Sequence, residues 1–371
     1  MSGSRIVYLA TADARGHLMR AQLLTHALRA RGAQVDVLTT SEEGMRFLAG
    51  FGITARLLSL HYAVQFDTRQ NMLRGATDAN VAAYLFHPGR MLRDILRLAP
   101  IVRGADMIIN DSFHPALLCM GSLPGWRKKV IHVYGVSLRL ALETNFVGRV
   151  PGWLAGLFRR IIALQLARSR ARLEHDFAYA DLSDCPDGSY RLPTPVAVVP
   201  CVEPAAPGKA RTAAVYMNPH FCDPAMADAL ERALAGAGVD GHLVGEGYAG
   251  RSGWLAQDAA WVERAVASDL MVSAPGMAAL SIALLYRRPI LLVLTDQPEQ
   301  QNNAARAARS GVLHRTIVWR DDAQAFADEA RSACLELLMQ AQEAGAGSER
   351  HGAAAARVQH WVTLLMTLAR A

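Results

Sequence analysis

The 371-residue sequence predicts an α/β protein with two doubly wound parallel sheets. Short apolar runs typical of buried strands alternate with amphipathic helical segments in both halves of the chain. A proline-rich segment separates the two series, and the length exceeds what one hydrophobic core usually serves. These observations together favour two Rossmann-like domains that face each other across a cleft, where ligands bind in this fold class.

The first series begins near the N-terminus with an apolar strand over Arg5–Ala10. The following segment carries a helical stripe of leucines and alanines, and Gly32 is a typical helix stop. A second strand over residues 34–40 completes a strand–helix–strand unit, the usual opening of a doubly wound sheet. Further strands of the same sheet are predicted over residues 105–111 and 129–135.

Six prolines lie between Cys185 and Gly208, and such a cluster is typical of an interdomain connection. A second series of strands and helices follows it and ends in a strongly amphipathic helix. We therefore expect an N-terminal domain over residues 1–185, a linker over 186–208 and a C-terminal domain over 209–348. Residues 349–371 are expected to form a helix that packs back toward the N-terminal domain.

Composition excludes several classes of protein. The net charge of +6 suits an anionic ligand or an anionic membrane surface, and no dense basic stripe or RNA-binding aromatic motif predicts nucleic acid as a partner. Five scattered cysteines without a CxxC pair argue against structural zinc and disulfides, and favour a reducing, cytoplasmic location. The longest uncharged run contains Pro275 and Gly276, so it predicts strand, turn and helix instead of a membrane span. No Gly-x-Gly-x-x-Gly motif follows the first strand, which argues against a dinucleotide-dependent oxidoreductase.

Two segments carry a family resemblance. The first is "ARGHLMRAQLLTHALRARGAQVDVLT", with a Gly-His-x-x-Arg opening. The second, residues 254–297, opens with Trp-x-x-Gln, passes a glycine turn and closes with Asp-Gln. Both resemble the GT-B glycosyltransferases of the inverting, nucleotide-sugar-dependent type, the group of UDP-glycosyltransferases and MurG-like enzymes. The resemblance implies a GT-B fold, in which a nucleotide diphosphate sugar is the donor and no cofactor takes part.

The resemblance also implies how the donor nucleotide is held. Trp254 would stack on the base, and Gln257 would meet its edge. Gly276 and Met277 stand where a helix begins, and backbone amides and the helix dipole favour an anion such as the diphosphate there. Trp254 has an alternative role as a core residue.

The sugar of the donor would be held after the last apolar strand of the segment. Asp296 and Gln297 would bind its hydroxyls, and the polar residues that follow add donors and acceptors. The alternative is that Asp296 caps the next helix. Asn218, at the exit of the strand "AVYM", is a further candidate for contact with phosphate or with the reacting centre.

Two family residues are replaced in the donor segment. Ala274 stands where a phosphate-binding His usually precedes the glycine turn, and Ile282 is the nearest match to an acid that grips the ribose. These replacements motivate a second hypothesis, a non-catalytic GT-B relative that acts by binding a partner. A sugar-nucleotide epimerase, which can share the fold, is the third.

His17 and Asp111 are the catalytic candidates. Imidazole titrates near neutral pH, so His17 suits the removal of a proton from an acceptor hydroxyl. Asp111 ends a predicted strand and would orient and charge-stabilise His17, as an acid does in a triad. The alternatives are a helix-start histidine and a capping aspartate. Asp13 and His114 are substitutes for the acid, and Arg20 would add positive charge one turn after His17.

A mixed apolar and basic segment covers residues 147–175. We predict that it either covers the acceptor cleft or dips into an anionic bilayer to collect a lipid acceptor, which would make the protein peripheral at the inner membrane face. Loops over 59–89 and 136–152 are the expected acceptor loops. The residues that define the patch are Trp153, Leu157, Phe158, Arg159 and Arg160.

The predicted function is sugar transfer from a nucleotide diphosphate sugar to a hydroxyl of a small-molecule or lipid acceptor, with inversion. Biosynthesis of a glycolipid or a natural product would use such a step. No Asp-x-Asp pair predicts a divalent metal ion, and helix dipole and amides would stabilise the leaving diphosphate instead.

Overall fold

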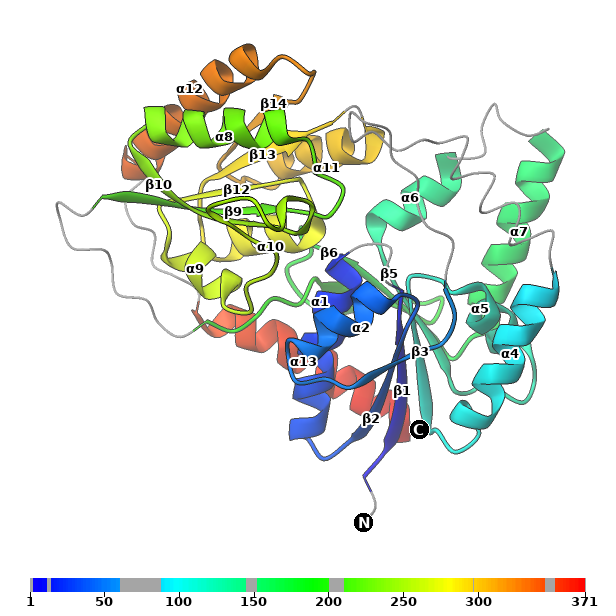
Figure 1. Ribbon diagram of the computed structural model, residues 1–371. Coiled ribbons are helices and arrows are strands. Elements are labelled where there is room, and N and C mark those ends of the chain that lie inside the picture. Colours follow the sequence, from blue (N-terminus) through cyan, green and yellow to red (C-terminus); the bar gives the residue numbers. More distant parts are fainter. Residues whose placement is uncertain are drawn as a thin grey trace. The chain divides into compact units, whose positions relative to one another are not determined.

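The computed structural model describes residues 3–11, 15–60, 88–144, 152–199, 210–295, 297–343 and 351–370. The chain forms two compact units, each built on its own sheet (Figure 1). Among the described residues, Val196 to Ala355 form the C-terminal unit, and those before Val196 and from Ala356 onward belong to the N-terminal unit. Two Rossmann-like parallel-sheet domains are the fold class that the sequence predicts.

The N-terminal unit contains an eight-stranded sheet in the order β3-β2-β1-β4-β5-β6-β8-β7. Its central strands are continuous apolar runs because both faces are covered by helices. All neighbouring strands are parallel except β7 and β8. The strands are β1 (Arg5–Ala10), β2 (Gln34–Thr39), β3 (Ala55–Leu57), β4 (Met107–Asp111), β5 (Val130–Gly135), β6 (Ala171–Asp176), β7 (Ser183–Asp184) and β8 (Ser189–Pro193).

Alternate residues of β1 serve two different cores. Ile6 and Tyr8 pack with α1, α2 and α13, whereas Val7 and Leu9 pack with α4 and α5 on the other face. The two faces therefore have separate helix layers. The helices of this unit are α1 (Arg15–Ala30), α2 (Glu42–Ala49), α4 (Pro88–Val102), α5 (Pro115–Ser122), α6 (Val136–Thr144), α7 (Gly152–Arg168) and α13 (His351–Arg370).

The last helix is anchored by its tryptophan. Trp361 is fully buried in the same core as β1 and α1. Its indole Nε1 donates a hydrogen bond to the Pro193 carbonyl over 2.8 Å. Helix α13 thus completes the helix layer on one face of the N-terminal sheet.

The C-terminal unit contains a six-stranded parallel sheet in the order β11-β10-β9-β12-β13-β14. One face carries a large core that α8 and α12 cover. The strands are β9 (Arg211–Met217), β10 (Val239–Gly245), β11 (Trp254–Leu255), β12 (Leu270–Ser273), β13 (Ile290–Leu294) and β14 (His314–Val318). The helices are α8 (Pro224–Gly236), the 3₁₀ turn η1 (Glu246–Tyr248), α9 (Trp261–Ala267), α10 (Met277–Leu285), α11 (Pro298–Arg309) and α12 (Ala323–Glu343).

Each sheet has a switch point, where the chain reverses the direction in which strands are added. In the N-terminal unit it lies between β1 and β4, and in the C-terminal unit between β9 and β12. Ligands of doubly wound sheets bind outside the carboxyl ends of the strands at such points. Ala10 of β1 pairs with Asp111 of β4, so Asp111 lies at the first switch point.

Two sequence expectations differ from the structure. Residues 136–144 of the expected acceptor loop 136–152 form α6, because apolar residues at helical spacing continue directly from β5. Strand β8 lies inside the expected linker 186–208, and it extends the N-terminal unit to Pro195. Proline is tolerated there because Pro193 ends the strand. The other expected acceptor loop, 59–89, lies mostly outside the described residues.

Candidate functional site

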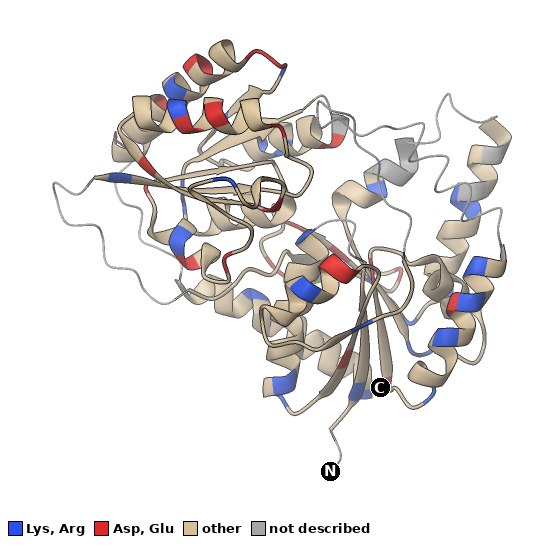
Figure 2. Cartoon of the chain, viewed as in Figure 1, with Lys and Arg blue, Asp and Glu red and all other residues tan. Residues whose placement is uncertain are grey.

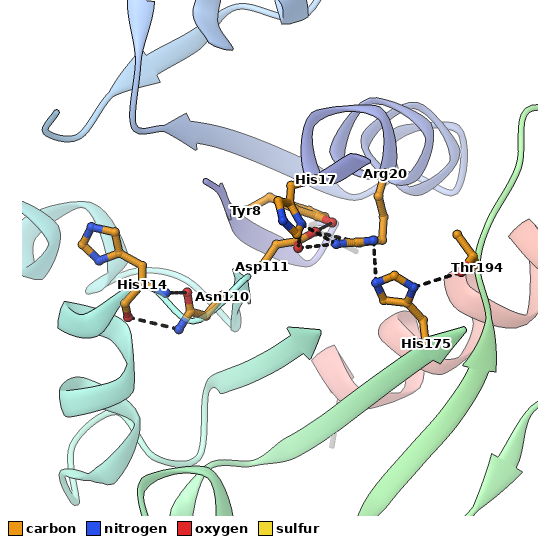
Figure 3. Close-up of polar contacts among 8 residues, drawn as sticks. All are labelled: Tyr8, His17, Arg20, Asn110, Asp111, His114, His175 and Thr194. Carbon is orange, nitrogen blue, oxygen red and sulfur yellow. Dashed lines mark hydrogen bonds and ion pairs between the residues drawn. The ribbon is translucent and has the colours of Figure 1, made fainter. Parts of the chain in front are cut away.

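Asp111 is the centre of a buried polar cluster at the end of β4 (Figure 3). Its carboxylate has four hydrogen-bonding partners among the described side-chain atoms. Oδ2 is 2.8 Å from the Tyr8 hydroxyl and 2.8 Å from Arg20 Nε. Oδ1 accepts from Arg20 Nη2 and lies 3.1 Å from His17 Nδ1, which donates to it when that nitrogen carries the proton. With a fully buried carboxylate and four partners, this cluster satisfies a charge that would otherwise be costly to bury.

His17 is the partly exposed member of the cluster, with 19% of its side chain accessible. Its Nδ1 lies 3.1 Å from Asp111 Oδ1 and 2.9 Å from Arg20 Nη2. Donation from Nδ1 to Asp111 leaves the Nε2 lone pair available for a proton, which is the state that general-base catalysis needs. Acceptance by Nδ1 from Arg20 would instead place the proton on Nε2. The protonation of Nδ1 therefore decides whether the ring can act as a base.

Arg20 and His175 extend the cluster across the sheet. Arg20 Nη1 lies 2.6 Å from His175 Nε2, and His175 Nδ1 lies 3.0 Å from the Thr194 hydroxyl. Because a guanidinium can only donate, His175 accepts at Nε2 and donates from Nδ1 to Thr194. Both residues are almost fully buried. The arrangement fixes Arg20 between an acid and a neutral imidazole.

The charges of the cluster follow from opposing physical effects. Burial alone would raise the pKa of Asp111, but the charge of Arg20 and the hydrogen bonds from His17 and Arg20 hold that pKa below its usual range. Burial, and then the nearby Arg20 charge, hold the pKa of His175 well below its usual value. Burial and Asp111 raise the pKa of Tyr8. The cluster thus contains one carboxylate and one guanidinium, with Tyr8 and His175 neutral.

The turn after Asp111 is conformationally strained. Ser112 and Phe113 both have positive φ, 76° and 61°, although neither is glycine. Asn110 holds this turn, since its Oδ1 accepts from the His114 amide over 2.9 Å and its Nδ2 donates to the His114 carbonyl over 3.3 Å. Such strain is usually retained at functional sites, and here it sets the direction in which Asp111 leaves the strand.

The two substitutes for the acid have different outcomes. Asp13 lies outside the described residues. His114 is fully buried at the start of α5, with Nε2 3.9 Å from Asp94 Oδ2, and its backbone is hydrogen-bonded to the side chain of Asn110, the residue before Asp111. Figure 3 shows its ring turned away from Asp111. Among the described candidates, Asp111 is therefore the acid that meets His17.

The glycine turn of the C-terminal unit lies at the second switch point. Strand β12 ends at Ser273, and Gly276 is the N-cap of α10 with no side-chain cap. No acid occupies the first turn of α10, and Met277 opens it. Gly276 has an ordinary φ of −79°, and an added Cβ would meet only the Ala274 carbonyl oxygen, at 4.0 Å. The backbone itself therefore does not require glycine here.

The remaining donor candidates are spread over this unit. Trp254 is only 5% exposed and packs on Tyr248, and its indole donates to Glu231 over 2.7 Å. That geometry is typical of a core residue. Stacking of Trp254 on a nucleotide base stays a prediction, which this packing does not favour. Gln257 is exposed beyond the short strand β11. Asn218 is half-buried after β9, and its side chain accepts from the His220 amide over 3.1 Å.

Side chains of the polar segment after β13 form hydrogen bonds to the backbone within the C-terminal unit, which the sequence does not reveal. Asp296 lies outside the described residues, and Gln297 is the half-buried N-cap of α11. Gln300 accepts from the Thr295 amide over 2.7 Å. Buried Asn303 donates to the Pro275 carbonyl over 3.0 Å, which ties this loop to the glycine turn.

The two replaced family positions are both buried. Ala274 is the first residue after β12, and Ile282 belongs to the buried face of α10. An acid at position 282 would therefore be buried within the unit in this structure.

Helix α7 exposes both apolar and basic side chains. Trp153 is 71% exposed and Leu157 is 47% exposed, and Arg159 and Arg160 are exposed beside them. The side chain of Phe158 lies outside the described part of the chain. No helix within the described ranges is long and apolar enough to cross a bilayer.

No group of three or more histidine, cysteine or acidic side chains in the described part of the chain is arranged to hold a metal ion.

Several solved structures resemble the chain over nearly its whole length. Spinosyn rhamnosyltransferase SpnG matches with a TM-score of 0.60 and 20% identity, covering 99% of this chain and 100% of that one. The glycosyltransferase of kitacinnamycin gives a TM-score of 0.59 and 16% identity over 99% of both chains. SnogD from Streptomyces nogalater gives 0.55 and 17%, again over 99% of both chains. The chain has the GT-B fold. No protein-family model matches the sequence, and no curated protein sequence does either.

Both candidate sites occupy the same kind of position, because each lies at the switch point of its sheet. In the N-terminal unit the sequence indicates His17, Asp111 and Arg20, and the structure brings these three together. Sequence reasoning missed Tyr8, His175 and Thr194. Tyr8 and His175 lie within buried strands and look like core residues, and only the strand order brings residues 20 and 175 together.

Proposed function

We propose that this GT-B protein is an inverting glycosyltransferase that uses a nucleotide diphosphate sugar. The observation that carries the proposal is the His17–Asp111 pair at the N-terminal switch point, with a partly exposed imidazole on a buried, fully hydrogen-bonded carboxylate. The GT-B structures that resemble the chain support the choice of sugar transfer.

In the proposed reaction, His17 Nε2 takes the proton of an acceptor hydroxyl as its oxygen attacks the anomeric carbon of the donor sugar. A new carbon–oxygen bond forms, and the bond from that carbon to the phosphate oxygen breaks. The nucleoside diphosphate leaves with the electron pair, and the proton remains on His17. Asp111 stabilises the resulting imidazolium and fixes the ring orientation.

Arg20 and His175 have a positioning role in this proposal. Arg20 holds Asp111 as a carboxylate through two hydrogen bonds. His175, oriented by Thr194, occupies the third side of the guanidinium. The acid therefore keeps its charge and its direction while His17 gains and loses a proton.

The C-terminal unit would bind the donor at the start of α10. The first amides of a helix lack partners within the helix, and the dipole adds partial positive charge. The first turn of α10 carries neither an acid nor a side-chain cap that would compete with an anion. Gln297, Asp296 and Asn218 are proposed to contact the sugar and phosphates, with Gln257 at the base. Backbone amides would stabilise the leaving diphosphate without a metal ion.

The neighbours narrow the choice of donor and acceptor. SpnG has been solved with thymidine diphosphate and with the spinosyn aglycone. By analogy, we propose a uridine or thymidine diphosphate sugar as the donor and a hydroxylated natural product or lipid as the acceptor.

Ala278→Glu tests the donor site without disturbing the fold. Ala278 is half-buried in the first turn of α10, where an acid stabilises a helix by roughly 0.3–1 kcal/mol. The same charge would repel a diphosphate, so we expect at least about tenfold weaker binding of uridine or thymidine diphosphate, which is roughly 1.4 kcal/mol. Isothermal titration calorimetry measures the affinity, and thermal unfolding checks that stability is unchanged or higher.

The matched control places an identical charge at another helix start. Ala325 is exposed in the first turn of α12, after the edge strand β14. Ala325→Glu should leave nucleotide affinity within about twofold of wild type. An equal loss of nucleotide affinity in both variants, or no loss in Ala278→Glu, would contradict diphosphate binding at the start of α10.

The two alternative functions make different predictions. An epimerase would alter a nucleotide sugar without any acceptor, and sugar transfer would not. A non-catalytic relative would keep its biological role in a His17→Ala variant. The continuous network from Thr194 to His17 favours catalysis, because a binding protein has no need for a partly exposed imidazole held by a buried acid.

We also propose that α7 contacts an anionic membrane. Its exposed Trp153 and Leu157 suit insertion at the headgroup level, while Arg159 and Arg160 would meet anionic lipids. In vesicle flotation, wild-type protein should float with vesicles that contain anionic lipid. Trp153→Ser/Leu157→Ser should remain in the soluble fraction. Wild-type protein that stays soluble with all vesicles would contradict this contact.

A further inference from the structure

A cavity of about 670 Å³ lies in the N-terminal unit beside α4 and the carboxyl ends of β2 and β3. Four arginines line it, namely Arg56, Arg90, Arg93 and Arg97. Leucine and isoleucine side chains form most of the remaining wall, with Ser59 and Asp94 as the other polar members. We call this cavity the arginine pocket. Figure 2 shows the basic residues along α4.

The positive charge of the arginine pocket is only partly balanced. Arg90, Arg93 and Arg97 are spaced by three and four residues, so they share one side of α4. Arg97 donates to the Leu58 carbonyl over 3.2 Å, and Arg56 lies 4.0 Å from Asp36. Within the described ranges, Arg90 and Arg93 form no ion pair or hydrogen bond.

The acid of the pocket is turned to internal partners. Asp94 is 3% exposed and accepts from the Ser59 hydroxyl over 3.0 Å. Its Oδ2 also lies 3.9 Å from His114 Nε2. This carboxylate therefore serves the wall of the pocket, and two exposed guanidinium groups remain for an incoming anion.

The pocket lies at the same edge of the sheet as the proposed base. Strands β3 and β2 stand next to β1 in the sheet, and the carboxyl end of β1 pairs with Asp111. Neighbouring strands are about 4.8 Å apart, so the step from β3 to β1 is roughly 10 Å. Asp94 contacts His114, whose backbone Asn110 holds beside Asp111. A molecule of moderate size could therefore span the pocket and the region of His17.

We propose that the arginine pocket binds an oxyanionic group of the acceptor, so that the acceptor is a hydroxylated, largely apolar molecule carrying a phosphate or carboxylate. That the bound molecule is an acceptor rests on the proposed sugar transfer. That the pocket binds an oxyanion rests on the residues of the pocket alone. Guanidinium groups bind oxyanions through paired N–H donors. The apolar walls beside them suit a hydrocarbon body.

Direct binding tests the pocket with simple probes. Wild-type protein would be titrated calorimetrically with octyl phosphate, with octanoate and with neutral octyl glucoside, each below its micelle concentration. We expect the two anions to bind and the neutral probe to bind at least tenfold more weakly. Arg90→Gln/Arg93→Gln should weaken octyl phosphate at least tenfold.

A matched variant removes the same charge elsewhere on the unit. Arg127 and Arg168 are exposed in a second basic cluster that shares no residue with the arginine pocket. Arg127→Gln/Arg168→Gln should keep octyl phosphate affinity within about twofold of wild type. Thymidine or uridine diphosphate, titrated into the same variants, should bind as to wild type, because its proposed site lies in the other unit.

The outcomes separate the pocket from the proposed function. No binding of octyl phosphate, or equal losses in both double variants, would overturn the arginine pocket. Flotation with anionic vesicles that depends on Arg90 and Arg93, without affinity for soluble octyl phosphate, would also overturn it, because the arginines would then serve a lipid surface. Octyl phosphate binding without any nucleotide binding would leave the pocket in place and contradict the donor proposal instead.

Discussion

Asp111→Asn is expected to destabilise the protein by roughly 3–5 kcal/mol, because it leaves the buried Arg20 guanidinium without its counter-charge. Asparagine offers one acceptor oxygen where the carboxylate has four hydrogen-bonding partners, and its amide would face donors from Arg20 or Tyr8. Urea unfolding at pH 7 measures the loss.

The pH dependence of this loss has a fixed sign. Because the pKa of folded Asp111 lies below its ordinary value, the carboxylate contributes its full stability above about pH 4. That contribution falls as the pH drops further, since protons then bind the unfolded chain more readily. The difference between wild type and Asp111→Asn should therefore narrow below pH 4.

Two variants separate the buried charge pair from a general effect of the substitution. Asp106→Asn makes the same chemical change at an exposed position at the opposite end of β4, where the side chain accepts from the Arg5 amide. It should cost less than about 1 kcal/mol. Asp111→Asn/Arg20→Gln removes both charges and should recover part of the stability but none of the activity. If Asp111→Asn alone were as stable as wild type, burial of the Arg20 guanidinium would not require the charge of Asp111.

His17→Ala is expected to lower kcat of sugar transfer by roughly 10²–10⁴-fold, the usual contribution of a general base. The melting temperature should change little, because the His17 side chain is partly exposed. The Michaelis constant for the donor should also change little, because the proposed donor site lies in the C-terminal unit. Steady-state release of nucleoside diphosphate, measured with a donor and acceptor that turn over, gives both constants.

His26→Ala is the matched control for His17. His26 lies on the same helix, exposed, with Nε2 3.0 Å from the Phe51 carbonyl oxygen. Its loss should leave kcat within about twofold of wild type. A His17→Ala variant that retains more than a tenth of the wild-type kcat would assign the proton transfer to another group.

Much of the fold can be predicted from the sequence, because the buried strands of parallel sheets are continuous apolar runs. Strand β1 matches its predicted bounds, and Gly32, predicted to stop the first helix, lies in the turn directly after α1 with φ of +83°. Strand β8 escapes prediction because a proline-rich segment normally argues against a strand. Helix α6 escapes it because no turn signal separates it from β5.

The candidate site is predictable at the ends of strands and the starts of helices, and hidden inside strands. Asp111 is the last residue of β4 and His17 lies in the first turn of α1, so their pattern indicates a site. His175 sits inside β6 and reaches Arg20 only through the strand order, which no local pattern specifies. For Trp254 the motif position suggests a contact with the nucleotide base, while its packing on Tyr248 is typical of the core role that the sequence also allows.

The contacts of Arg20 show why a histidine motif alone is not sufficient for the proposed chemistry. His17 Nδ1 has two competing neighbours, and only donation to Asp111 leaves Nε2 free. Arg20 also donates to His175 Nε2 over 2.6 Å, so its guanidinium is held on the side away from His17 as well.

The anomeric configuration of the product tests the central claim most directly. With a donor and an acceptor that give turnover, proton NMR of the freshly formed glycoside reports the coupling at the anomeric carbon. Deprotonation by His17 and a single in-line displacement predict inversion, so an α-linked donor should give a β-linked product. A product with retained configuration would contradict the account, because retention requires two successive displacements at the anomeric carbon and excludes the single in-line attack of the acceptor oxygen.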